Sequence, residues 1–191
     1  MRFHKILIVI LFILTLFTCD NEHYFPKPKS YLRINFPIKE YYAIDDNCPF
    51  TFEIPNYSAW VKKFNDNQPC NKAIIYPDFK AEVLCDYMSI NDNLYEVSED
   101  FRKMVYKHSF KSNAIIERVW ENDSNKVYGL AYEIKGNTAC NYAFTLTDSN
   151  RHFFSGQLLF QIKPNYDSLK PSIEFLQKDI EAMIASFKWE D

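Results

Sequence analysis

Residues 138–168 read TACNYAFTLTDSNRHFFSGQLLFQIKPNYDS, and the alternation in this stretch decides the expected fold. Large apolar side chains recur at every second position on both sides of a short polar segment. They are Tyr142, Phe144 and Leu146 before it, and Phe154, Leu158, Phe160 and Ile162 after it. A period of two with one apolar face is typical of half-buried antiparallel strands. Asp148-Ser149-Asn150 supplies the turn, and Gly156 leaves room for a bulky neighbour on the apolar face.

The rest of the chain predicts more strands and two helices. The expected strands are residues 48–54, 72–76, 80–87, 114–120, 126–134, 139–147 and 151–163. Apolar residues at helical spacing predict a helix from about residue 94 to 107, opened by a capping box of Asn93 and Glu96. A second helix follows Ser168, its expected N-cap. Helices outside a run of consecutive strands favour a single-domain α+β fold, a mainly antiparallel sheet with a C-terminal four-strand meander packed by two helices.

Composition excludes several classes of protein. The chain has 191 residues, of which 47% are hydrophobic and 17% aromatic, so it can bury a core and is not disordered. Its net charge of −3 is not the basic profile of a nucleic-acid-binding protein. Only 3 glycines exclude glycine-rich phosphate loops.

The N-terminus has the features of an export signal. Arg2 and Lys5 precede a short apolar run, residues 6–18, which ends at Cys19. That run is shorter than a comfortable membrane span. Its end, Leu16-Phe17-Thr18-Cys19, looks like a bacterial lipobox, so we expect Cys19 to be lipidated; the alternatives are a non-lipidated signal peptide and a signal anchor. The expected divisions are a lipoprotein signal peptide (1–18), a lipidated N-terminus with a Pro/Lys tether (19–40) and the α+β domain (41–191). The protein is then exported and held to a membrane of the cell envelope, with its domain in the periplasm.

Four cysteines remain after Cys19, an even number in an oxidising compartment. They allow three pairings, and we prefer a disulfide between Cys48 and Cys70, which closes a loop of about twenty residues. Cys85 and Cys140 fall on apolar strand faces and fit unpaired core positions. No CxxC or CxxH spacing supports a metal site, and no cofactor is expected.

Asp148, Ser149 and His152 are the residue types of a nucleophilic triad. Three such groups at the tip of one hairpin have no water-excluded oxyanion hole, and the sequence has no GxSxG elbow. Plain turn chemistry or a partner-binding loop explains them better. We therefore expect no catalytic residues and no enzymatic activity.

Three blocks in order along the chain resemble one known family. They are PKPKSYLRINFP (26–37), CPFTFEIPNYS (48–58) and TDSNRHFFSGQLLF followed by PNYDS (147–168). Together they are similar to the gliding-motility lipoprotein GldD family of Bacteroidota, over essentially the whole mature chain. Ser30 stands where the family more usually has Gly, and Ser155 where we expect Arg.

The resemblance implies a lipid-anchored, non-enzymatic component or assembly factor of the gliding motility and type IX protein secretion machinery. Its partners would be other lipoproteins and membrane subunits of that machinery, and the membrane itself. The resemblance is sharpest at the hairpin tip and in PNYDS, so the expected partner-binding residues are Asp148, Ser149, Asn150, Arg151, His152, Asn165 and Asp167. A rival hypothesis is a lipoprotein that binds an apolar or lipid ligand in a cavity between sheet and helices.

Overall fold

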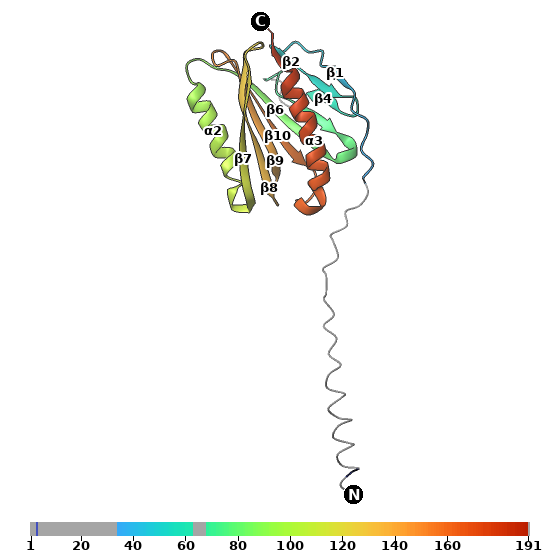
Figure 1. Cartoon of the computed structure of the whole chain (residues 1–191). Coiled ribbons are helices and arrows are strands. Elements are labelled where there is room, and N and C mark those ends of the chain that lie inside the picture. The colour runs from blue at the N-terminus through green and yellow to red at the C-terminus, as the bar shows by residue number, and fades with distance from the viewer. Residues whose placement is uncertain (1–2, 4–33, 63–67, 191) are drawn as a thin grey trace. The chain divides into compact units, whose positions relative to one another are not determined.

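The chain folds around a seven-stranded antiparallel sheet, which a computed structural model describes together with its helices (Figure 1). The structure describes residues 3, 34–62 and 68–190. The chain divides into two units, Met1–Leu32 and Arg33–Asp191, of which the second contains the sheet and both of its helices. The expected signal peptide, the lipidated Cys19 and the Pro/Lys stretch 26–29 lie outside the described residues. The predicted α+β fold, a mainly antiparallel sheet with two helices, is confirmed.

The elements follow one another in a simple order. They are β1 (Tyr41–Ala43), β2 (Phe50–Thr51), β3 (Glu53–Pro55), β4 (Ala59–Lys62), β5 (Lys72–Tyr76), η2 (Pro77–Phe79), β6 (Ala81–Ser89), α2 (Leu94–Tyr106), η3 (Ser109–Lys111), β7 (Ser112–Asn122), β8 (Val127–Gly136), β9 (Cys140–Thr147), β10 (His152–Phe160), α3 (Tyr166–Ser186) and β11 (Lys188–Trp189). The sheet has the order β4-β5-β6-β10-β9-β8-β7.

The expected four-strand meander is present as β7 to β10, but it is only part of the sheet. β6 pairs along the whole of β10, from His152↔Ser89 to Phe160↔Ala81, and adds β5 and β4 beyond it. The predicted hairpin is therefore at the centre of the sheet and not near its edge. A pairing between segments more than sixty residues apart leaves no local signal in the sequence.

Both faces of the central hairpin are covered, where the sequence predicted one buried face. Phe144 and Phe154 pack in a cluster with Leu176 and Ile180 of α3. Ala143 and Phe153, on the other face, pack with Phe101 and Val105 of α2. The two helices thus lie on opposite faces of the sheet. The alternation favours a solvent-facing position for the small and polar residues of β9, but they are buried under α2.

Asn141 shows how a polar residue is accommodated on that second face. Its side-chain amide donates to the carbonyls of Ile134 and Gly136, at 3.0 and 3.1 Å, and lies 3.2 Å from Thr138 Oγ1. A buried amide with its hydrogen bonds made carries no large desolvation cost. The polar residue therefore closes the β8–β9 turn and does not mark an exposed face.

Gly156 lies directly under an aromatic ring, as its place among large residues predicted. A Cβ at this position would come within 2.2 Å of the Phe144 ring on the neighbouring strand. Phe144 is 1% exposed and has no room to move outward. The absence of a side chain at Gly156 is what allows this ring to lie flat over β10.

Both helix starts differ from the expected caps. Asn93 makes no side-chain cap bond to α2; its Oδ1 accepts from the backbone N–H of Asn91 instead, so the expected capping box is absent. For α3 the N-cap is Asn165, whose Oδ1 accepts from the N–H of Ser168 at 3.4 Å. Asn165 precedes Ser168 by one turn and reaches the first unpaired N–H groups, so it displaces Ser168 as the cap.

Residues 34–40, assigned to the tether by their sequence, pack against the domain. Phe36 stacks on Phe175 of α3 with ring centroids 4.3 Å apart. Lys39 Nζ donates to Asp179 Oδ1 at 2.6 Å and lies 4.1 Å from the Phe175 ring centroid. Asp179 is 1% exposed, so this ion pair joins the segment to the interior of the domain. The domain therefore begins earlier than the sequence division at residue 41.

The first strands of the domain are held by a disulfide and a neighbouring ion pair. Cys48 and Cys70 are joined, with Cα atoms 5.7 Å apart. Asp46 lies two residues before Cys48, and Lys72 lies two residues after Cys70. Lys72 Nζ donates to the Asp46 carboxylate, which also accepts from Trp60 Nε1. The expected strand 48–54 is divided into β2, which pairs with β11, and β3, which pairs with β1. Every second residue of this stretch is nevertheless buried: Cys48, Phe50, Phe52 and Ile54.

Candidate functional site

The β9–β10 turn is organised by Asp148. Its Oδ1 accepts from the backbone N–H of Asn150, Arg151 and His152, at 3.0, 2.8 and 2.8 Å. Burial alone would raise the pKa of Asp148, but these hydrogen bonds outweigh it and lower the pKa below its ordinary value. Ser149 has a left-handed φ of 68°, as a tight polar turn requires. Asp148 thus shapes the turn, while Ser149, Asn150 and Arg151 are the residues that the turn exposes.

His152 links this turn to two other parts of the fold. Its Nδ1 lies 2.9 Å from the hydroxyl of Tyr87 on β6. Its ring stacks on Trp189 of β11, with centroids 5.1 Å apart and planes 17° from parallel. Trp189 Nε1 in turn donates to the carbonyl of Lys126 at 3.1 Å. The ring is therefore partly buried, hydrogen-bonded and stacked, so its orientation is fixed by β6 and β11.

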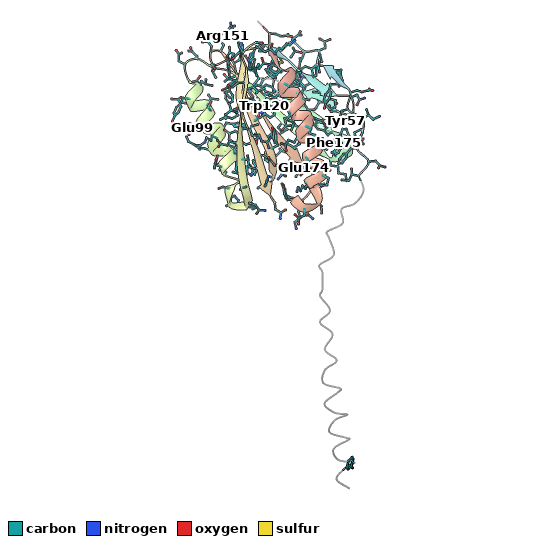
Figure 2. All side chains as sticks on the ribbon, in the orientation of Figure 1. Tyr57, Glu99, Trp120, Arg151, Glu174 and Phe175 are labelled. Carbon is teal, nitrogen blue, oxygen red and sulfur yellow. A yellow bond between two sulfur atoms is a disulfide. The ribbon has the colours of Figure 1, made fainter. Side chains whose placement is uncertain are left out.

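Three chain segments meet at this end of the sheet, and we call their surface the tip surface. It consists of the β9–β10 turn (148–152), the β7–β8 turn (123–126) and β11 (188–189). They enclose a hollow of about 380 Å³. Its lining residues are Ser124, Asn125, Lys126, Asp148, Asn150, Arg151, His152, Lys188 and Trp189. Figure 2 labels Arg151 at one end of the sheet.

Positive charge predominates in this hollow. Lys126, Arg151 and Lys188 come from three different segments, and Asp148 is the one carboxylate of the lining. Lys126 and Lys188 form no ion pair with any residue in the described part of the chain. The neighbouring Asp123 accepts a hydrogen bond from Tyr128 at 3.1 Å. The arrangement suits recognition of a polar, negatively charged group and supplies no nucleophile with a base.

The remaining two expected partner-binding residues lie at the other end of the sheet. Asn165 and Asp167 begin α3, beside the β8–β9 turn, where Asn137 accepts from the N–H of Tyr166 at 2.7 Å. β10 has nine residues and at about 3.4 Å each spans about 27 Å between the two ends. An antiparallel strand carries the chain away from its own turn, so the tip and PNYDS cannot form one surface.

Sequence reasoning missed five of the lining residues, although a signal exists: Ser124, Asn125, Lys126, Lys188 and Trp189. In a meander, alternate turns lie at the same end of the sheet, so the β7–β8 turn must accompany the β9–β10 turn. α3 then returns along the sheet for 21 residues, about 30 Å, and places the C-terminal residues at that end too. Figure 1 shows the C-terminus there.

Other candidate positions serve the core. Ser155, where the resemblance led us to expect Arg, is buried in β10 between Asp86 and Thr145. The buried thiols of Cys85 and Cys140 point at backbone carbonyls, and burial raises the pKa of Cys140 to about 12. Among residues 34–62 and 68–190, no cluster of three or more His, Cys, Asp or Glu side chains is placed to hold a metal ion.

A second hollow, of about 310 Å³, opens between α2 and the strands β7 and β8. Its lining is mainly apolar and includes Leu94, Val119, Trp120, Leu130 and Phe153, with Glu99 and Arg102 at the helix. Figure 2 labels Glu99 on α2 and Trp120 over the sheet. In the described residues no helix has the length and apolar character needed to cross a membrane.

Comparison with known proteins identifies first a class of fold and then a family. The solution structure of cyanobacterial PsbP (CyanoP) from Synechocystis sp. PCC 6803 is similar, with a TM-score of 0.50, 13% identity, and coverage of 83% of this chain and 97% of that one. At this identity the likeness shows the fold alone, an antiparallel sheet with helices on both faces. Comparison with curated protein sequences found no match. The family model described as gliding motility lipoprotein GldD matches residues 21–189, and the chain belongs to this family.

Proposed function

We propose that this protein is a lipid-anchored, non-enzymatic component or assembly factor of the gliding motility and type IX protein secretion machinery. The observation that carries the proposal is the tip surface: exposed polar side chains from three segments are held rigidly at the end of a packed sheet. Asn150, Arg151 and Lys188 contribute nothing to the hydrophobic core, whereas the strands beneath them do. Rigid scaffolds commonly present binding residues on such turns. We propose that another subunit of the machinery contacts this surface.

The proposed anchor is the acyl chain of Cys19, which would hold the domain to a membrane of the cell envelope, on its periplasmic side. Growth of cells with labelled palmitate tests it: the wild type should incorporate the label and a Cys19→Ala variant should not. Unlabelled wild-type protein would contradict the anchor.

Site-specific photo-crosslinking tests the partner contact. A photoreactive residue at Asn150 should yield a crosslinked subunit in intact cells, and one at Lys163, exposed at the other end of the sheet, should not. Equal capture from both positions, or from neither, would contradict the proposed surface.

A variant with Asn150 and Arg151 both replaced by Ala should keep its thermal midpoint, since exposed turn substitutions usually change stability by less than about 0.5 kcal/mol. It should impair gliding and secretion, while Lys163→Ala should not. Asp148 is left in place because it organises the turn. Normal gliding and secretion with the stable variant would refute the proposal.

The hollow between α2 and the sheet supports a second candidate, binding of an apolar or lipid ligand. Val119 is 67% exposed at its rim, so part of the apolar lining faces solvent. Purification from membranes followed by lipid extraction tests this candidate. A stoichiometric lipid, lost in a Leu130→Glu variant that still folds, would favour it over the first.

A further inference from the structure

We infer that the hollow of the tip surface binds an acidic segment of the partner protein, through Lys126, Arg151 and Lys188. This inference rests on the proposed partner contact and names the chemistry of the partner. The three cations converge from the β7–β8 turn, the β9–β10 turn and β11 on one hollow of about 380 Å³. That volume can accept side-chain carboxylates together with part of an extended backbone.

The charge of the hollow is opposite to that of the chain. The whole chain carries −3, yet the described lining of the hollow holds three cations and one carboxylate, and two of the cations, Lys126 and Lys188, form no ion pair with a described residue. That carboxylate, on Asp148, already accepts three backbone N–H groups, so its charge is partly offset within the turn. A local patch of opposite sign steers an acidic partner to this site and away from the rest of the surface.

The floor and walls of the hollow suit a peptide. The Trp189 ring, fixed by stacking on His152 and by its bond to the Lys126 carbonyl, offers a flat apolar wall. Asn125 and Asn150 offer amide groups, of which Asn125 Nδ2 already donates to the Phe187 carbonyl. An acidic peptide can place carboxylates on the cations and its backbone against the amides.

The position of the hollow favours a protein over lipid headgroups. The domain's first described residue, Ile34, lies beside Asp78 and Ser172, at the end of the sheet where α3 begins. The hollow is at the other end, the length of β10 away. The first described residue of the domain is therefore at the end that lies away from the cations, and the proposed lipid anchor precedes it in the sequence.

Titration of the full-length protein in detergent with a capped tetra-glutamate peptide tests the inference. The indole N–H resonance of Trp189 reports on the hollow, and those of Trp60 and Trp120 serve as internal controls, since neither residue lines it. Tetra-glutamate should shift the Trp189 resonance saturably, with affinity falling as salt is raised. A capped tetra-glutamine peptide should not shift it.

The chain offers a closely matched pair of variants. Lys126 and Lys80 are both exposed and both left-handed, with φ of 52° and 48°, but Lys80 lies at the far end of the sheet. Asn tolerates this conformation without the charge. Lys126→Asn and Lys188→Gln should each weaken binding about threefold, the usual value of an exposed ion pair, and Lys80→Asn should leave it unchanged. Lys126→Asn should not lower the thermal midpoint.

Four results would overturn the inference: no shift with tetra-glutamate, an equal shift with tetra-glutamine, equal weakening by Lys80→Asn, or a stronger response to inorganic phosphate or phosphatidylglycerol vesicles than to the peptide. If Asn150 still crosslinks a subunit while tetra-glutamate has no effect, the acidic-segment inference fails and the proposed function stands. If neither occurs, both fail.

Discussion

Replacing Asp179 by Ala should lower the free energy of unfolding by about 3–5 kcal/mol, the usual cost of removing one partner from a buried ion pair. The Asp179 side chain is 0% exposed. Its Oδ1 accepts from Lys39 Nζ at 2.6 Å and Tyr41 OH at 2.9 Å, and its Oδ2 from Tyr57 OH at 2.7 Å. Burial, together with these bonds to the carboxylate, raises the pKa of both tyrosines. Truncation removes the acceptor of both tyrosine hydroxyls and leaves the Lys39 ammonium with the Phe175 carbonyl but without its counter-charge.

Thermal and urea unfolding would measure the loss, which for a domain of this size corresponds to a fall of about 10 °C in the midpoint. Glu174→Ala is the matched control on the same helix. Its carboxylate is 61% exposed and pairs with Lys170 at 3.8 Å, so its removal should cost less than about 0.5 kcal/mol. Figure 2 shows Glu174 and Phe175 next to each other on α3. Tyr57→Phe, which removes one hydrogen bond to a charged acceptor, should cost about 2 kcal/mol.

Hydrogen exchange would show where the loss acts. Because the network joins residues 39–41 to α3, Asp179→Ala should speed amide exchange in β1 and β3 before it does so in β9. A loss of less than about 1 kcal/mol, or uniform exchange throughout the domain, would refute the reasoning that this carboxylate fixes the N-terminal segment.

Three further predictions concern single sites. Peptide mapping without reductant should recover Cys48 linked to Cys70, and replacing both with Ser should cost about 3 kcal/mol for a separation of 22 residues; recovery of either in another pairing would contradict this. Gly156→Ala should destabilise by about 1–3 kcal/mol, because its Cβ would meet the Phe144 ring, and Phe144→Leu should restore part of the loss. Asp148 has a lowered folded pKa, so its contribution is present above about pH 4, the unfolded value, and is lost as pH falls through the folded pKa. Asp148→Asn should therefore destabilise by about 1 kcal/mol at pH 7 and by less at pH 3; an equal effect at both pH values would contradict the assignment.

The alternation around residues 142–162 was enough to predict the central hairpin, its turn and the contact at Gly156. Successive side chains of a strand point to opposite faces, so a strand with one apolar face can be recognised from a single sequence. It could not show that a second helix covers the other face, because Asn141, Ala143 and Thr145 look the same whether they face water or a helix. Burial of such residues depends on hydrogen bonds such as those of Asn141, which only the folded chain reveals.

Long-range pairing was the part of the fold and site that the sequence could not give. β6 lies beside β10, and Trp189 lies under His152, through contacts across more than thirty residues. The tip residues themselves were found because turns have local chemistry. Their grouping with Lys126 and Lys188 follows from strand direction and helix length. The separation of Asn165 and Asp167 from the tip follows from the length and direction of β10.

The position of β7 at the end of the sheet has a consequence for crowded surroundings. An exposed outer strand of 11 residues has unpaired backbone groups that could recruit a strand from another molecule. Here two of its three charged side chains are engaged within the domain: Glu117 accepts from Tyr106 OH at 2.8 Å, and Arg118 lies 3.4 Å from Glu133. A strand laid along this edge would have to desolvate these groups. At the other edge the described part of β4 has four residues. These contacts disfavour edge-to-edge pairing when many copies lie side by side on a surface.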